Sequence, residues 1–140
     1  MHLPCPTCDR TNRVPAQRLL DKARCAACKG PLLPLDRAVP VASAEDFDEL
    51  ARDAAAPVLV DFWAGWCAPC RVVGPELEKV AAARAGALIV AKVDTEALPE
   101  VAGRFAVQSI PTMVLLRGGR EATRLSGAMP AAAILARLGV

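Results

Sequence analysis

All six cysteines of the chain stand in Cys-x-x-Cys pairs, and this spacing is the main chemical feature of the sequence. The pairs are Cys5/Cys8, Cys25/Cys28 and Cys67/Cys70. Two thiols at this spacing can bind one metal ion, form a disulfide, or cycle between thiol and disulfide. The residues around each pair therefore have to distinguish these three chemistries.

The first two pairs have the spacing of a tetrahedral zinc site, because sixteen residues separate Cys8 from Cys25. Each short loop directs two sulfurs at one ion, and two loops complete the shell. The predicted ligands of a structural Zn²⁺ are Cys5, Cys8, Cys25 and Cys28. Four thiolates fill the shell, so neither His2 nor Asp9 is predicted to bind the metal. Two local disulfides, or one redox pair with a spare pair, are the alternatives.

The third pair, in the stretch DFWAGWCAPC, has a different setting, because it follows an apolar run and opens a predicted helix. At the helix N-terminus, free N–H groups and the helix dipole stabilise the Cys67 thiolate. Cys70 follows one turn later, close enough to attack a mixed disulfide formed by Cys67. Pro69 suits the first turn, where its missing N–H costs nothing. We therefore predict a reversible redox pair.

The elements that must position these cysteines alternate between strands and helices after residue 38. We expect strands at 39–42, 57–63, 87–94, 111–117 and 120–126, and helices at 43–53, 67–84, 96–105 and 131–138. Crossover units followed by a hairpin at Gly118-Gly119 predict an α/β fold with a central mixed sheet and helices on both faces. The core-facing positions predicted for the second helix are Val72, Val73, Leu77, Val80 and Ala81.

The N-terminal segment is predicted to be a separate small module. Pro31, Pro34 and Pro40 indicate a linker, and we place the boundary so that residues 1–36 form the module and residues 37–140 the main domain. Residues 1–37 carry seven Lys/Arg against three Asp/Glu, whereas the rest carries ten against twelve. We interpret this basic excess as a solvated face rather than a nucleic-acid site.

The sequence shows no secretory pattern at its start and no uncharged run of 18 residues or more, so we expect neither export nor a membrane span. In the cytoplasm, paired cysteines more often bind metal or perform redox chemistry than form structural disulfides. We expect a cytoplasmic monomer.

Residues 57–140 resemble the thioredoxin family through DFWAGWCAPC, AKVD, SIPT, the Gly118-Gly119 turn and LSGA. With the front motifs CPTC, TNRVP and CAAC, the whole chain resembles the thioredoxin-2 type. The resemblance implies a thioredoxin fold with a zinc-ribbon-like module. It also implies a protein-disulfide reductase of cell redox homeostasis and the oxidative-stress response. Its electrons would come from NADPH through a flavin-containing thioredoxin reductase, since this chain carries no nucleotide-binding motif.

The resemblance also implies roles for single residues near the redox pair. Cys67 would attack substrate and Cys70 would resolve the mixed disulfide. Asp61 would be a buried carboxylate that relays a proton to Cys70, with Lys92 as its partner. A strand-end Asp61 turned to solvent and an exposed Lys92 are the alternatives.

Further family positions form the predicted substrate surface. Pro111 would be a cis-proline, beside which the main chain of Ile110 pairs with substrate, and an ordinary trans turn proline is the alternative. Trp66 and Gly127 would add a flat apolar contact. Between the cysteines the family usually has glycine where this chain has Ala68, so Ala68 and Pro69 are expected to tune the redox potential.

The leading interpretation is therefore a thiol–disulfide oxidoreductase that reduces disulfide-containing proteins, with no nucleic-acid or membrane partner. One alternative is a zinc-dependent protein-interaction module with a secondary redox domain. The other is a more oxidising disulfide oxidase or isomerase.

Overall fold

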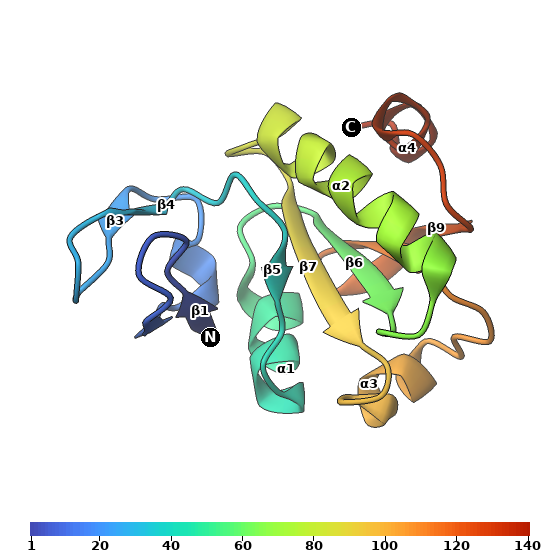
Figure 1. The fold of residues 1–140 in the computed structure, drawn as a ribbon, viewed down its shortest axis with the longest axis horizontal. Helices are drawn as coiled ribbons and strands as arrows, with labels where there is room; N and C mark the ends of the chain where they lie inside the picture. Colours follow the sequence, from blue (N-terminus) through green and yellow to red (C-terminus); the bar gives the residue numbers. More distant parts are fainter.

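A five-stranded mixed sheet forms the centre of the molecule (Figure 1). Its strands, in spatial order, are β5 (Val39–Pro40), β7 (Ile89–Asp94), β6 (Val58–Trp63), β8 (Thr112–Arg117) and β9 (Arg120–Ser126). The first three run parallel, and the last two complete the sheet as an antiparallel hairpin. The computed structural model describes all residues from 1 to 140.

Helices cover both faces of this sheet, as the sequence predicts. They are α1 (Ala44–Asp53), α2 (Ala68–Ala83), α3 (Pro99–Arg104) and α4 (Ala131–Leu138). Buried side chains of α1 and α3 share one core cluster with one face of the sheet, and those of α2 and α4 share a second cluster with the other. The predicted α/β fold is therefore confirmed.

Local sequence signals set the ends of several elements. The Ser43 hydroxyl accepts a hydrogen bond from the Asp46 N–H (3.1 Å) and so caps α1. Gly118 and Gly119 have φ angles of +58° and +79°, which glycine adopts without strain in the hairpin turn. The apolar run of β6 is buried on both faces, as a central strand requires.

One predicted core position is wrong. Val72 is 64% exposed, whereas Val73, Leu77 and Val80 on the same helix are fully buried. In this part of α2 the buried residues are Cys70, Val73 and Leu77, three and four positions apart on one face, and Val72 points about 100° away from Val73, toward solvent.

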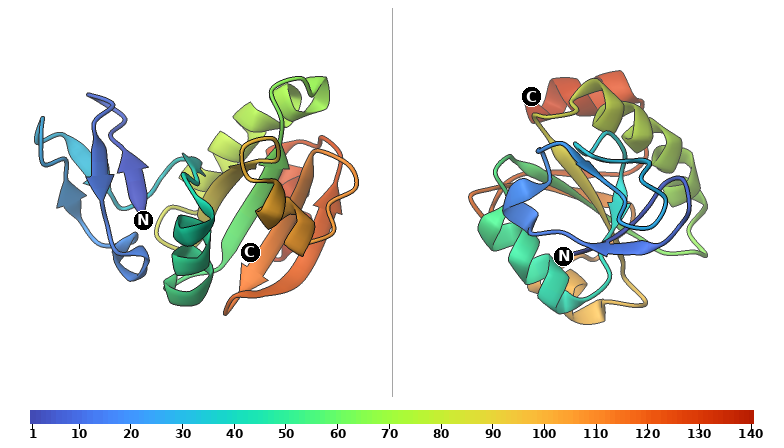
Figure 2. Two further views of the ribbon diagram at one scale, coloured as in Figure 1. Left: turned by 90° about the horizontal axis from the view of Figure 1, so that it is seen from below. Right: turned by 90° about the vertical axis from the view of Figure 1, so that its left-hand side faces the viewer.

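The N-terminal module consists of two hairpins and a short helical turn. Its elements are β1 (His2–Pro4), β2 (Thr11–Arg13), η1 (Ala16–Arg18), β3 (Ala23–Arg24) and β4 (Pro31–Leu33). β1 pairs only with β2, and β3 only with β4. Figure 2 shows this front module against α1 and β5, at one end of the sheet.

The linker predicted around the prolines is much shorter than expected. Pro31 begins β4, where a residue without an N–H is tolerated. Leu32, Leu33 and Leu35 are buried in the same cluster as Phe47 of α1, so the two parts share one continuous core. The segment between the prolines is therefore packed structure rather than a flexible connection.

Glu49 on α1 adds a polar contact between the front module and the sheet domain. Its carboxylate accepts hydrogen bonds from the Met1 ammonium group (2.9 Å) and from the Ala16 N–H (2.7 Å), and it lies 2.9 Å from the Arg13 guanidinium. Burial opposes the ionisation of Glu49, but these hydrogen bonds outweigh it and lower its pKa to about 2.

We predict that Glu49→Gln lowers the free energy of unfolding by about 2 kcal/mol, because three donors lose their anionic acceptor. A depressed carboxyl pKa stabilises the folded state above the unfolded pKa, and the stabilisation is lost as the pH falls toward about 2. Thermal unfolding measured as a function of pH checks this: Glu49→Gln should flatten the acid limb of the curve. Glu45→Gln, an exposed change on the same helix, should not.

No helix of this chain combines the length and the apolar character that crossing a membrane requires.

Candidate functional site

Cys67 and Cys70 lie where the central strand β6 passes into α2, and they form a disulfide with Cα atoms 5.3 Å apart. Cys67 is the N-cap residue of α2, and its sulfur accepts a hydrogen bond from the Cys70 N–H (3.2 Å). A thiolate at this position would face the positive end of the helix. Both cysteines are largely buried, at 3% and 6% exposure.

The alternation of β6 places Asp61 beneath the helix that carries Cys70. Leu59 belongs to the core cluster under α2, and Asp61 follows two residues later, so its side chain points to the same face. On the neighbouring strand, Lys92 is the register partner of Asp61. A carboxylate and an ammonium group therefore share the α2 face of the sheet with the redox pair.

The Asp61 carboxyl is 1% exposed, and neither of its oxygens has a hydrogen-bond partner within the protein. Burial raises the pKa of Asp61 to about 6, and the charge of Lys92 only partly opposes the shift. The Lys92 ammonium lies over the Trp63 ring, 4.9 Å from its centroid. A cavity of about 300 Å³ brings Lys92, Trp63 and Cys70 together.

We predict that Asp61→Asn stabilises the oxidised chain by about 3 kcal/mol near pH 8 and has little effect near pH 4. A carboxyl group whose folded pKa lies above its unfolded value stabilises the fold at low pH, and this contribution is lost as the pH rises through about 6. Urea unfolding at the two pH values measures the difference. Asp36→Asn is the control, since Asp36 is exposed, and an equal gain at both pH values would contradict the prediction.

A candidate substrate surface lies beside the disulfide, next to the Cys67 sulfur. The Cys67 sulfur is 3.8 Å from the carbonyl oxygen of Ile110, and the Ile110–Pro111 peptide bond is cis. The Gly127 N–H donates to the Pro111 carbonyl (2.9 Å), which joins the loops on that side. Trp66 is 69% exposed and lines a cavity of about 190 Å³ together with Ile110.

Two polar contacts at this site were not predicted from the sequence. The Trp66 indole N–H donates to the Glu96 carboxylate (2.8 Å), and the Arg71 guanidinium donates to the Gly65 carbonyl (2.5 Å). Between Trp66 and Glu96 the chain forms α2 and β7, whereas Gly65 and Arg71 lie six residues apart across the start of α2. No sequence pattern indicated either pairing.

The four front cysteines gather into one cluster in which all sulfurs lie within 4.8 Å of one another. Cys5 and Cys28 have sulfurs 3.7 Å apart, and those of Cys8 and Cys25 are 3.6 Å apart. A tetrahedral ion with Zn–S bonds of about 2.3 Å separates its ligands by about 3.8 Å, so the cluster fits zinc and is too open for disulfides.

The two cysteine loops have matching geometry. The Cys5 N–H donates to the Arg10 carbonyl, and the Cys25 N–H donates to the Gly30 carbonyl (2.9 Å in both). Amide groups also point at the sulfurs: Thr7 N–H at Cys5 (3.4 Å) and Ala27 N–H at Cys25 (3.4 Å). Such bonds stabilise thiolates and orient metal ligands.

The cluster that could hold a metal ion contains only cysteines. His2 contacts Asp46 of α1 through its ring nitrogen (3.1 Å) and lies outside the cluster, as does Asp9, which has a φ of +65° in the first cysteine loop. Asn12 is a neighbour that sequence reasoning missed. Its amide donates to the Cys25 sulfur (3.5 Å), and its carbonyl accepts from the Ala26 N–H (3.0 Å).

Comparison with known proteins covers both parts of the chain. The sequence profile of the family described as Thioredoxin matches residues 38–139, and the profile described as Thioredoxin 2, N-terminal, a zinc ribbon, matches residues 4–30. Thioredoxin C-3 of Corynebacterium nephridii is 38% identical over 130 residues, which cover 92% of this chain and 87% of that protein.

Two further relatives extend the comparison. The bifunctional thioredoxin reductase/thioredoxin of Mycobacterium leprae is 52% identical over 79 residues, which cover 56% of this chain and 17% of that protein. The crystal structure of Malassezia sympodialis thioredoxin superimposes with a TM-score of 0.64 at 29% identity, covering 71% of this chain and 87% of that one.

Proposed function

Since the chain belongs to the thioredoxin family, we propose that Cys67 attacks substrate disulfides and Cys70 resolves the resulting mixed disulfide. The chain itself is a thiol–disulfide oxidoreductase that acts on protein disulfides through this pair. The observation that supports the order of attack is the position of Cys67 as N-cap of α2, where its sulfur accepts the Cys70 N–H.

In the proposed reaction the Cys67 thiolate attacks one sulfur of the substrate disulfide, and the other sulfur leaves as a thiolate that takes up a proton. The Cys70 thiol then loses its proton and attacks the Cys67 sulfur. This second exchange releases the remaining substrate sulfur as a thiolate. Two electrons have passed to the substrate, and Cys67–Cys70 is left as a disulfide.

We assign Asp61 the role of proton acceptor for Cys70. Its pKa of about 6 lies close to neutral pH, which suits a group that both takes up and releases a proton. The unpaired oxygens and the position under α2 support this role. Lys92, on the adjacent strand, would moderate the charge that forms on Asp61.

The substrate main chain is proposed to pair with Ile110 and to contact Trp66, Pro111 and Gly127. The Ile110 carbonyl already faces the Cys67 sulfur, so an extended segment that pairs there brings its own sulfur into range. Ala68 and Pro69, in the first turn of α2, are proposed to set the potential through the helix N-terminus.

The front module is proposed to bind one structural Zn²⁺ through its four cysteines. The sulfur separations fit a tetrahedral shell, and a zinc-ribbon family matches this segment. A bound ion would link the β1–β2 hairpin to the β3–β4 hairpin through the four sulfur atoms. We treat residues 1–36 as this zinc module and residues 37–140 as the redox domain.

We propose that a thioredoxin reductase regenerates the dithiol with electrons from NADPH in the cytoplasm. The M. leprae relative carries both activities in its name, which supports such a pairing for the matching segment of this chain.

One coupled assay tests the proposal: NADPH consumption is followed with this chain, a thioredoxin reductase and a disulfide-containing protein. The expected result is steady consumption that requires all three components. A redox potential well above about −230 mV, measured against glutathione, would instead assign the chain to the oxidases or isomerases.

A further inference from the structure

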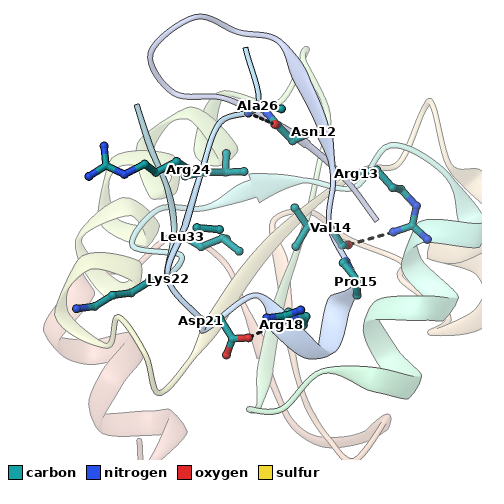
Figure 3. Close-up of a pocket in the computed structure, with 12 residues that line it drawn as sticks. Asn12, Arg13, Val14, Pro15, Arg18, Asp21, Lys22, Arg24, Ala26 and Leu33 are labelled. Atoms are coloured by element: carbon teal, nitrogen blue, oxygen red, sulfur yellow. Dashed lines mark hydrogen bonds and ion pairs between the residues drawn. The ribbon is translucent and has the colours of Figure 1, made fainter. Parts of the chain in front are cut away.

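A groove on the front module, separate from the redox site, has the features of a peptide-binding surface. It runs between β2 and β3 and encloses a cavity of about 340 Å³ (Figure 3). Its walls are the segments 12–15 and 21–24, and Leu32 and Leu33 of β4 form its floor. No residue of the groove lines the cavities beside Cys70 or Trp66.

The groove has a closed end and an apolar centre. At the cysteine end, the Ala26 N–H donates to the Asn12 side chain and joins the two walls, as Figure 3 shows. Val14 of one wall and Leu33 of the floor line the centre of the groove with aliphatic side chains that are largely buried. Residues 1–37 contain no Phe, Tyr or Trp, so the groove has no aromatic ring on which a nucleic-acid base could stack.

One wall presents a free strand edge. Hydrogen bonds join β1 to β2 at the pairs Met1/Val14 and Cys5/Arg10, and in an antiparallel ladder such pairs alternate with unbonded ones. Arg13 therefore turns its main-chain N–H and C=O away from β1, on the groove side of the strand. An extended segment can add to such an edge as a third strand.

The rim of the groove is basic. Its charged residues are Arg13, Arg18, Asp21, Lys22 and Arg24. Arg18 pairs with Asp21 and Arg13 with Glu49, whereas Lys22 has no partner and Arg24 donates only to the Lys29 carbonyl. In Figure 3 Lys22 and Arg24 extend outward from the β3 wall. Two cations are thus available to an incoming anionic partner, in a segment, residues 1–37, that carries +4 against −2 for the rest of the chain.

From these contacts we propose that the groove binds an extended, acidic segment of a partner protein, which adds as a strand beside β2. Aliphatic side chains of that segment fill the space between Val14 and Leu33. Its acidic side chains lie near Lys22 and Arg24. Binding here leaves Cys67 and Cys70 free, so a tethered partner is held at high effective concentration near the redox pair.

The test uses the zinc-loaded full chain and a short, cysteine-free, fluorescein-labelled peptide in which valine alternates with glutamate. Fluorescence anisotropy should show saturable binding. The double variant Lys22→Glu/Arg24→Glu should weaken it about tenfold or more, because attraction becomes repulsion. The control is Arg117→Glu/Arg120→Glu, the same charge change on the exposed β8–β9 turn, which should leave the affinity unchanged.

Two further probes separate the proposal from simpler charge effects. A peptide with N-methylated amides cannot join a strand edge, and it should bind at least about tenfold more weakly. A peptide with lysine in place of glutamate should not bind. Equal binding of all three peptides, equal effects of both double variants, or binding of a short RNA in place of the acidic peptide would each overturn the proposal.

Discussion

Replacing Cys70 with serine is expected to leave the chain covalently attached to its substrate instead of releasing it. Cys67 keeps its position as N-cap of α2, so its thiolate still attacks the substrate disulfide. No second thiol then stands within reach, because Cys5, Cys8, Cys25 and Cys28 belong to the distant front cluster. Turnover should fall by about a thousandfold or more, as when a nucleophile is removed from other enzymes.

Non-reducing electrophoresis and mass spectrometry detect the adduct, which should disappear after treatment with dithiothreitol. Cys67→Ser is the matched variant: it should lose turnover to a similar extent but form no adduct, since only the Cys67 sulfur lies at the N-cap of α2 and accepts the Cys70 N–H, which favours its thiolate. A stable adduct with Cys67→Ser, and none with Cys70→Ser, would reverse the proposed order of attack.

Removing the Zn²⁺ that we propose for the front module is expected to destabilise the whole chain far more than it slows catalysis. Cys5 and Cys25 are buried in the cluster that includes Phe47 and Leu50 of α1, so loosening the cysteine loops disturbs the core of the redox domain. We expect chelation, or Cys25→Ser, to lower the free energy of unfolding by about 3 kcal/mol or more. The redox pair lies elsewhere on the sheet, so its rate should change by less than about threefold, an amount below about 1 kcal/mol.

Calorimetry with metal analysis measures the first effect, and the coupled assay measures the second. Thr7→Ala is the matched control, because Thr7 is an exposed residue of the first cysteine loop that is not a ligand. Unchanged stability after chelation would contradict the prediction, as would a loss of activity in proportion to lost zinc at temperatures where the chain stays folded.

Periodic and motif-based features of this fold were predictable from the sequence, because single residues or local runs encode them. The Ser43 cap, the apolar β6 and the Gly118-Gly119 turn all lie where local patterns put them. The third helix begins later than expected, at Pro99, because the Asp94 side chain first holds a turn by accepting the Glu96 N–H (2.9 Å). Proline at the first helical position then starts the helix.

Features that depend on contacts between distant segments were not predictable. Glu49 appears in the sequence as an ordinary surface acid, and only the folded chain brings Met1, Arg13 and Ala16 to it. Pro31 and its neighbours look like a linker until β3 supplies a strand partner. The same holds for Trp66 and Glu96, whose contact depends on two loops meeting. Tertiary pairing overrides local composition in all three cases.

The shared core also has a consequence for protein engineering. A shortened chain that starts at the redox domain would lose Leu3, Leu19 and Leu35, which share one core cluster with Phe47 and Leu50 of α1. Removing the front module therefore exposes part of that core and is expected to cause aggregation. If the front module is grafted onto another thioredoxin, the first helix of the recipient has to supply equivalents of Asp46 and Glu49, whose carboxylates accept hydrogen bonds from the front module. The unit that can be transferred is therefore the front module together with α1.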